Sequence, residues 1–316
     1  MFIKLAYNYQ HDVWRYLVGF VVIFIVWQLG SFPFLLVAGL EAYSQDGDLS
    51  FLEDPNRIMS ILDSNLTLFL MLLSFVIGLL ALYVWVKYIH KQPMLRLTTT
   101  RKKVDWGRFM FGFGLIGIVT VGLTIMDYYG NPESYVLQFE MVPFIILAVI
   151  AIIFVPLQTS FEEYLFRGYL MQGIGTIARN RWVPLLITSV FFGGLHFFNP
   201  EVDKLGNVIM IYYIGTGLFL GIITLMDEGL ELALGFHAGN NLVAALLVTA
   251  DWTAFQTNSI LKDISEPTAG VDILIPILIV YPIFLGLMAW RYKWSNWKDK
   301  LFGKIAPPAT VSTVSE

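Results

Sequence analysis

The sequence predicts an all-α protein: a polytopic bundle of about eight transmembrane helices, with both termini in the cytoplasm. The composition indicates a membrane protein, because 57% of the 316 residues are hydrophobic and only 14% are charged, whereas soluble domains carry about 25% charged residues. Apolar stretches of about 20 residues, long enough to cross a bilayer as a helix, recur along the chain. Basic residues gather in alternate connections between these stretches, as expected when Lys and Arg stay in the cytoplasm.

The apolar segments account for most of the chain and predict one integral membrane domain over residues 1–316. The functional motifs fall within residues 142–250, and the tail 307–316 is expected to be loose. A secretory signal peptide is the alternative for the first segment, but its apolar run is too long for one. The eight segments are residues 17–40, 66–89, 109–126, 142–161, 182–198, 207–226, 230–250 and 272–290.

The distribution of basic residues predicts the orientation. With the N-terminus inside, 17 of the 20 Lys and Arg residues, Arg167 among them, fall on the cytoplasmic side. The first outer loop, residues 41–65, is acidic. We therefore expect a multi-pass protein of the inner or plasma membrane, surrounded by the lipid bilayer and with no nucleic-acid partner. The basic residues left outside are Arg57, Lys204 and Lys262.

A cluster of charged residues, Glu162, Glu163 and Arg167, follows directly on the fourth apolar segment. Charged side chains cost about 2.5–3.5 kcal/mol each at the centre of a bilayer, so their presence needs a reason. On a helix, Glu163 and Arg167 are four residues apart, which predicts an ion pair. Glu162 points about 100° away and stays free to accept a proton. The alternative is that the cluster is a solvated helix end in the cytoplasm.

Two of the four histidines, His196 and His237, lie inside predicted membrane segments. An antiparallel hairpin folded about the polar turn at residues 178–181 places Glu163 opposite His196, each about 25 Å from the turn. His237 and Asn241 are four residues apart and share one helix face. Their imidazole and amide could donate hydrogen bonds to an oxyanion. The alternative for each group taken alone is a hydrogen bond between packed helices.

Two further features limit the chemistry and the packing. The chain has no cysteine, which excludes disulfides, thiolate nucleophiles and cysteine-bound metals. Any catalysis must therefore use carboxylates, imidazoles, amides or hydroxyls. Small residues four apart, Ser189 with Gly193 and Gly217 with Gly221, predict close packing of the helices that carry them.

The motifs Glu162-Glu163-x-x-x-Arg167, Phe192-x-x-x-His196 and His237-x-x-x-Asn241, in this order on three predicted helices, together resemble the three motifs of the CPBP family of intramembrane proteases. This family includes type II CAAX prenyl endopeptidases and bacterial Abi-type relatives. The resemblance implies an endopeptidase that cuts a membrane-embedded or lipidated protein at a site within the membrane, open toward the cytoplasm.

The resemblance also implies a role for each motif residue. Glu162 would be the general base that activates water, assisted by His196. His237 and Asn241 would stabilise the tetrahedral oxyanion, and the predicted ion pair would position and support the base. The residues carried over from the family are Glu162, Glu163, Arg167, His196, His237 and Asn241.

Other mechanisms and functions remain as alternatives at this point. We expect hydrolysis without a cofactor, but Glu162, His196 and His237 could ligate zinc, with water as the fourth ligand. The chain lacks the HExxH motif, and its histidines lie on separate helices. An ion- or proton-coupled transporter could use the same Glu, His and Arg residues as a relay, although no inverted repeat is visible. A catalytically idle membrane scaffold or immunity protein could retain the motifs for packing.

Overall fold

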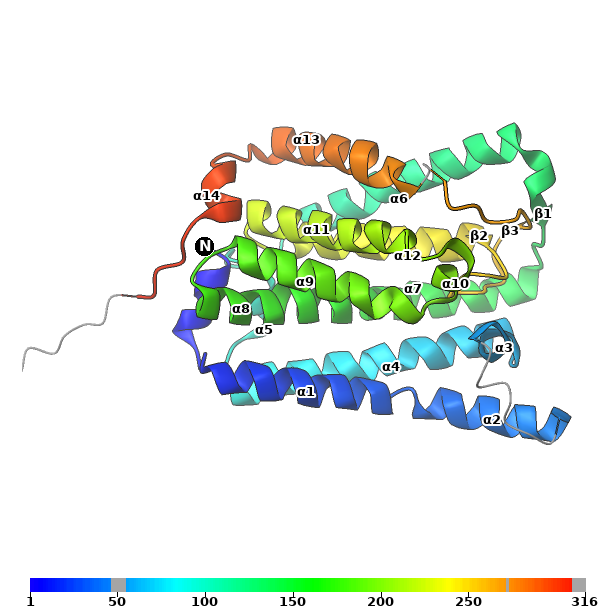
Figure 1. Ribbon diagram of the computed structural model, residues 1–316, viewed down its shortest axis with the longest axis horizontal. Helices are drawn as coiled ribbons and strands as arrows, with labels where there is room; N and C mark the ends of the chain where they lie inside the picture. Colours follow the sequence, from blue (N-terminus) through cyan, green and yellow to red (C-terminus); the bar gives the residue numbers. More distant parts are fainter. Residues whose placement is uncertain (47–54, 271–272, 309–316) are drawn as a thin grey trace, which may run out of the picture.

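The structure is a computed structural model that describes residues 1–46, 55–270 and 273–308. Its long helices run side by side along one axis (Figure 1). The N-terminus and α14 (Trp297–Phe302) lie at one end of this bundle, here called the α14 end, and three short strands lie at the other, the sheet end. Of the tail that is expected to be loose, residues 309–316 lie outside the described residues.

Most of the described chain is helical. The α-helices are α1 (Val13–Leu29), α2 (Phe32–Asp46), α3 (Pro55–Ser60), α4 (Ser64–Val84), α5 (Met94–Thr98), α6 (Trp106–Gly130), α7 (Met141–Glu163), α8 (Met171–Ala178), α9 (Trp182–Gly194), α10 (Pro200–Leu205), α11 (Ile209–Asp227), α12 (Glu231–Leu247), α13 (Tyr281–Tyr292) and α14. Short 3₁₀-helices form at Ile3–Asn8, Pro132–Ser134 and Leu195–Phe198. Segments of π-helix form at Trp85–Ile89, Tyr164–Leu170 and Pro276–Val280.

Each of the eight predicted segments overlaps at least one of these helices, and the first overlaps both α1 and α2. Five helical stretches among the described residues are long and apolar enough to cross a membrane: Val13–Gln45, Ser64–Ile89, Trp106–Gly130, Met141–Ala178 and Ile209–Asp227. The apolar helices at Trp182–Phe198 and Pro276–Tyr292 are shorter, and α12 has 17 residues. The chain is thus an integral membrane protein, while the count of eight crossings and the cytoplasmic location of the termini stay predictions.

The first predicted segment, residues 17–40, is part of a longer stretch that is interrupted between α1 and α2. Gly30 lies at the interruption. A Cβ atom there would come within 3.0 Å of Ser74 Cα on α4. The absence of a side chain therefore lets the two backbones approach closely where α1 ends.

The fourth predicted segment, residues 142–161, continues beyond the charged cluster instead of ending there. α7 passes through the π-helical segment Tyr164–Leu170 into α8, which makes one helical stretch of 38 residues. Charges argue for a boundary only when they would face lipid. Here the helix can continue because its charges face the interior of the bundle.

The all-α prediction needs one correction, because three short strands form at the sheet end. They are β1 (Tyr135–Leu137), β2 (Val248–Thr249) and β3 (Leu261–Asp263). β3 lies between the other two, antiparallel to β1 with Asp263 opposite Tyr135, and parallel to β2 with Leu261 opposite Val248. These segments lie outside the helices, so their backbone N–H and C=O groups need other partners and find them in each other.

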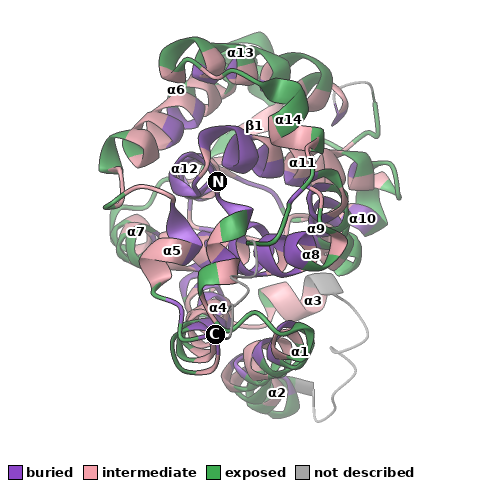
Figure 2. Cartoon of the chain, turned by 90° about the vertical axis from the view of Figure 1, so that its left-hand side faces the viewer, coloured by how far each residue is buried: buried purple, intermediate pink, exposed green. Residues whose placement is uncertain are grey.

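The outside of the bundle is apolar, and the central helices are buried. Viewed from the α14 end, α12 and the adjacent faces of α8 and α11 are buried, whereas α1, α6 and α13 carry the exposed faces (Figure 2). Exposed side chains on the long helices are largely hydrophobic; Ile118 on α6 is 77% exposed and Val142 on α7 is 68% exposed. Such a surface suits contact with lipid chains, because its side chains are apolar and the backbone N–H and C=O groups are hydrogen-bonded within the helices.

The predicted close packing of small residues is confirmed between α9 and α11. A Cβ atom on Gly217 would lie 3.0 Å from Ser189 Cα. A second close contact, between α6 and α12, has no counterpart in the predicted pairs. There, a Cβ atom on Gly235 would collide with the carbonyl oxygen of Phe109, and one on Gly239 would lie 2.7 Å from that of Phe113. Glycine therefore sets how closely α12 approaches α6.

We expect Gly235→Ala to lower the free energy of unfolding by about 1–3 kcal/mol, because the added methyl group overpacks the contact with the α6 backbone. Urea unfolding in mixed micelles would measure the change. Gly114→Ala on α6 is the matched control, since its Cβ atom would meet no atom within 4 Å. If the two variants were equally stable, the close approach of α6 and α12 would not be as described.

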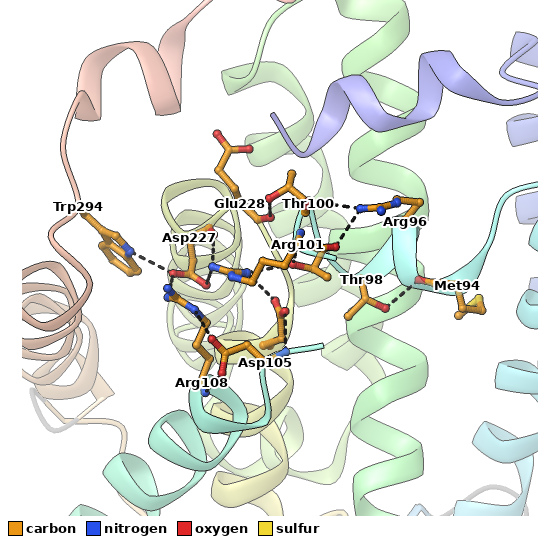
Figure 3. A network of polar contacts seen from close by, with 12 residues as sticks. Met94, Arg96, Thr98, Thr100, Arg101, Asp105, Arg108, Asp227, Glu228 and Trp294 are labelled. Carbon is orange, nitrogen blue, oxygen red and sulfur yellow. Dashed lines mark hydrogen bonds and ion pairs between the residues drawn. The ribbon is translucent and has the colours of Figure 1, made fainter. Parts of the chain in front are cut away.

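At the α14 end, a network of ion pairs ties α6, α11 and α12 together (Figure 3). Arg101 donates to Asp227 Oδ2 at 2.8 Å and to Glu231 Oε2 at 3.0 Å. Arg108 also pairs with Asp227, and Trp294 Nε1 donates to Asp227 Oδ1 at 3.2 Å. Both carboxylates are buried, so their charges are compensated by arginine rather than by water.

Candidate active site

The charged cluster lies inside the bundle, where α7 passes into its π-helical continuation. Glu163 and Arg167 are fully buried, and Arg167 Nη1 donates to Glu163 Oε1 at 2.8 Å. Arg167 Nη2 donates to the carbonyl of Gly217 on α11 at 3.1 Å, and its guanidinium lies 4.2 Å from the ring centre of Phe192 on α9. The predicted ion pair is confirmed. The alternative of a solvated helix end in the cytoplasm is wrong.

His237, on α12, lies between the two carboxylates of the cluster. Its Nδ1 is 2.8 Å from Glu163 Oε1, and its Nε2 is 3.5 Å from Glu162 Oε2. The hairpin construction predicts that Glu163 faces His196, but Glu163 contacts His237 instead. That construction assumes unbroken α-helices, whereas the π-helical segment Tyr164–Leu170 changes the rotation of the chain relative to an α-helix.

His196 lies just beyond α9, in the 3₁₀-helix that follows it. Its Nδ1 is 2.9 Å from the carbonyl oxygen of Phe192, so an N–H at this position can donate to the backbone. The imidazole stacks on the ring of Tyr213 from α11, with 4.3 Å between ring centres and 22° between planes. Because one ring nitrogen faces the backbone, Nε2 is the nitrogen left for other contacts.

Asn241 lies one turn beyond His237 on α12, as the spacing predicts. Its Nδ2 donates to Gln158 Oε1 on α7 at 3.3 Å. Gln158 is itself one helical turn before Glu162. Gln158 is not among the predicted site residues, although a glutamine inside an apolar segment is a signal that could identify it.

A cavity of about 380 Å³ brings several of these groups together. Glu162, His196 and Asn241 line it, from α7, from the turn after α9 and from α12. A smaller cavity of about 110 Å³ shares His196 and Asn241 and is also lined by His237. Four of the six predicted site residues therefore face a cavity. The other two, Glu163 and Arg167, form the buried ion pair, which contacts this group through His237.

The larger cavity leads from Glu162 toward the sheet end. Its wall there includes Asn199, Glu201 and residues 253–255, and Ala254 N–H donates to Glu201 Oε1 at 2.9 Å. The resemblance implies a site open toward the cytoplasm, whereas the distribution of basic residues predicts that the cytoplasm lies at the α14 end. These two expectations disagree in this structure.

Glu201 lines the cavity and is not among the predicted site residues. Its Oε2 atom is buried and has no hydrogen-bond partner in the part of the chain that the structure describes. Burial raises the pKa of the Glu201 carboxyl above its usual value, and the hydrogen bond from the backbone of Ala254 partly opposes this. Nothing in the sequence separates Glu201 from other acidic residues in connections, because its place in the wall depends on how α10 packs.

The three residues named for a metal, Glu162, His196 and His237, are not grouped as metal ligands in the part of the chain that the structure describes. Across residues 1–46, 55–270 and 273–308, no three His, Asp or Glu side chains are grouped so that they could hold a metal ion. Glu162 and His237 approach each other at 3.5 Å, but His196 is not grouped with them as a third ligand. This arrangement does not fit the three protein ligands of a catalytic zinc.

Comparison with known proteins agrees with the resemblance. Residues 141–243 match the family model described as type II CAAX prenyl endopeptidase Rce1-like. This segment runs from α7 into α12 and contains all six predicted site residues, so the resemblance is confirmed at the level of the family. The "Uncharacterized protein YyaK" of Bacillus subtilis (strain 168) is 28% identical over 292 residues, which cover 92% of this chain and 96% of that protein.

Proposed function

We propose that the chain is a glutamate-dependent intramembrane endopeptidase of the CAAX type, which hydrolyses a peptide bond in a membrane-embedded or lipid-modified protein. One observation carries the proposal: Glu162, His196 and Asn241, from three separate helices, line one cavity inside a bundle with an apolar exterior. Polar groups at such a depth are expensive and usually functional. The match of residues 141–243 to the endopeptidase family supports the same reaction class.

In the proposed reaction, the Glu162 carboxylate takes a proton from a water molecule as the water oxygen attacks the carbonyl carbon of the scissile bond. The carbonyl oxygen becomes an oxyanion, to which His237 and Asn241 donate hydrogen bonds. Glu162 then passes the proton to the leaving nitrogen, the C–N bond breaks, and a carboxyl group and an amine are released. His196 assists by orienting the water through a hydrogen bond.

Glu163 and Arg167 act as positioning residues in this proposal. The 2.8 Å contact between Glu163 Oε1 and His237 Nδ1 sets the direction of the imidazole, as carboxylates do for histidines at other sites. Arg167 in turn holds Glu163. In this proposal the ion pair therefore orients His237, the oxyanion donor. The resemblance instead implies that the pair supports Glu162, the base.

A direct test uses the full chain in lipid nanodiscs with three substrates: a prenylated CAAX peptide, the same peptide without the prenyl group, and a transmembrane peptide. We expect cleavage of at least one, with one ¹⁸O atom from labelled water in the new carboxyl group, measured by mass spectrometry. If none were cut and proteoliposomes instead showed a proton flux that required Glu162, the transporter alternative would replace this proposal.

We also propose that hydrolysis needs no metal ion, because a carboxylate rather than a Lewis acid activates the water. Treatment with EDTA and 1,10-phenanthroline is therefore expected to leave the cleavage rate unchanged, while a zinc protease treated in parallel loses its activity. Inhibition that is reversed by added zinc would contradict this expectation and favour Glu162, His196 and His237 as ligands.

A further inference from the structure

We propose that the candidate active site is entered from the extracytoplasmic side of the membrane. Its substrates would then be segments of exported or membrane-anchored proteins that lie outside the cytoplasm. The statement about substrates rests on the proposed function. The statement about the side from which the cavity is reached does not depend on that function. It is carried by the course of the cavity, by the closed interior on the other side, and by the charges at the two ends.

The course of the cavity connects the site with the sheet end. From Glu162 and Asn241 its wall continues to Asn199 and Glu201 near α10 and to Thr253 after β2. Polar groups line this route, and Glu201 Oε2 has no partner among the described residues. Apolar residues such as Val248 and Phe255 also line the route. An extended peptide has backbone N–H groups that need acceptors, so a mixed wall that offers carboxylate and amide oxygens suits a peptide.

On the other side of Glu162, the interior is filled with large side chains. Leu165, Phe166 and Tyr169, which follow Glu162 along the helix, are each 1% exposed. Tyr169 reaches the start of α1 and donates to the carbonyl oxygen of Arg15 at 2.8 Å. From Glu162 to the end of α8 the helix is about 24 Å long. The described residues therefore separate the site from the α14 end by a packed layer.

The two ends of the bundle differ strongly in basic residues. Arg167 lies inside, and Arg57, Lys204 and Lys262 lie at the sheet end. The remaining sixteen of the 20 basic residues lie at the α14 end, in the elements and connections that meet there (Figures 1 and 3): Lys4, Arg15, Lys87, Lys91, Arg96, Arg101, Lys102, Lys103, Arg108, Arg179, Arg181, Arg291, Lys293, Lys298, Lys300 and Lys304.

This asymmetry predicts which end is cytoplasmic. Connections rich in Lys and Arg stay in the cytoplasm, and acidic residues have little influence on the outcome. The acidic partners in the network at the α14 end, such as Asp227, therefore do not weaken the prediction. With the α14 end in the cytoplasm, the sheet end and the cavity that leads to it face outward.

Cysteine labelling tests the side of entry directly, because the chain has no native cysteine. Ala244→Cys places a thiol on the wall of the cavity, three residues beyond Asn241, and Thr253→Cys places one near its end. Thr100→Cys, at the α14 end, is the matched control; the Thr100 side chain there donates to the carbonyl oxygen of Glu228. Each variant is treated in intact spheroplasts and after permeabilisation with a charged, membrane-impermeant thiol reagent.

We expect Ala244→Cys and Thr253→Cys to react in intact spheroplasts, and Thr100→Cys to react only after permeabilisation. Thiols counted after denaturation in detergent confirm that each cysteine is present. Reaction of Thr100→Cys in intact spheroplasts would overturn the inference. So would an Ala244→Cys thiol that is protected until the membrane is opened, because the cavity would then be closed to the outside.

A second measurement separates this inference from the proposed function. Membrane-anchored reporters carry the same cleavable segment on either the outer or the cytoplasmic side of one transmembrane helix. We expect cleavage of the outer segment alone. Cleavage restricted to the cytoplasmic segment would refute entry from outside while leaving the protease intact. Outward labelling without cleavage of either reporter would count against the proposed function and not against the direction of the cavity.

Discussion

Replacing Glu162 with glutamine is expected to lower kcat/KM for peptide cleavage by about 10²–10⁴-fold, the usual contribution of a general base. Glutamine has nearly the shape of glutamate but cannot accept a proton from water. Glu162 Oε2 lies 3.5 Å from His237 Nε2, and a glutamine side chain can occupy the same place. The fold should therefore persist while the reaction is lost. Cleavage kinetics in nanodiscs and unfolding of the same preparation would measure the two properties separately.

Glu140→Gln is the matched control for this substitution. Glu140 is exposed and lies at the start of the same helix, α7, where its side chain makes no capping hydrogen bond. We expect its kcat/KM to equal that of the wild type. A Glu162→Gln protein that folds and still cuts as fast as Glu140→Gln would show that another group activates the water.

Replacing Arg167 with methionine is expected to lower the free energy of unfolding by about 3–5 kcal/mol, because it leaves a buried carboxylate without its charge partner. Glu163 is fully buried, and its Oε1 accepts from Arg167 at 2.8 Å. The substitution also removes the hydrogen bond to the carbonyl oxygen of Gly217. Equilibrium unfolding in mixed micelles, followed by tryptophan fluorescence, would measure the loss.

The double variant Glu163→Gln with Arg167→Met separates charge from packing. Because it removes both charges, we expect it to be more stable than Arg167→Met alone. Arg291→Met, which changes an exposed arginine on α13, should alter stability by less than about 1 kcal/mol. If the double variant were no more stable than the single one, the ion pair would not be the source of the effect.

Features that depend on one helix could be predicted from the sequence. The apolar segments, the ion pair between Glu163 and Arg167 and the shared face of His237 and Asn241 all follow from composition or from a spacing of four residues. The ion pair and the shared face are confirmed, because residues four apart on a helix are neighbours whatever the rest of the chain does. The apolar segments are helical, while the number that cross the membrane stays a prediction.

Features that depend on two helices were less accessible. The carboxylate opposite His196 could not be chosen from depth along a hairpin, because the π-helical segment Tyr164–Leu170 changes the rotation of the helix. The close approach of α12 to α6 depends on Gly235 and Gly239 meeting backbone atoms, and no short-range pattern specifies that partner. Likewise, Glu201 enters the cavity wall only because α10 packs near the segment after β2.

The sequence by itself determined that this chain is a membrane protein and which of its residues carry unusual polarity, since the cost of placing charge in lipid depends on composition and local spacing. Only the tertiary structure decided that His237 lies between Glu162 and Glu163, that the ion pair is fully buried, and that the cavity leads to the sheet end. Those relations join residues far apart in the chain. They depend on how each helix is rotated and how closely it packs. Side chains and glycines from several helices determine both of these together.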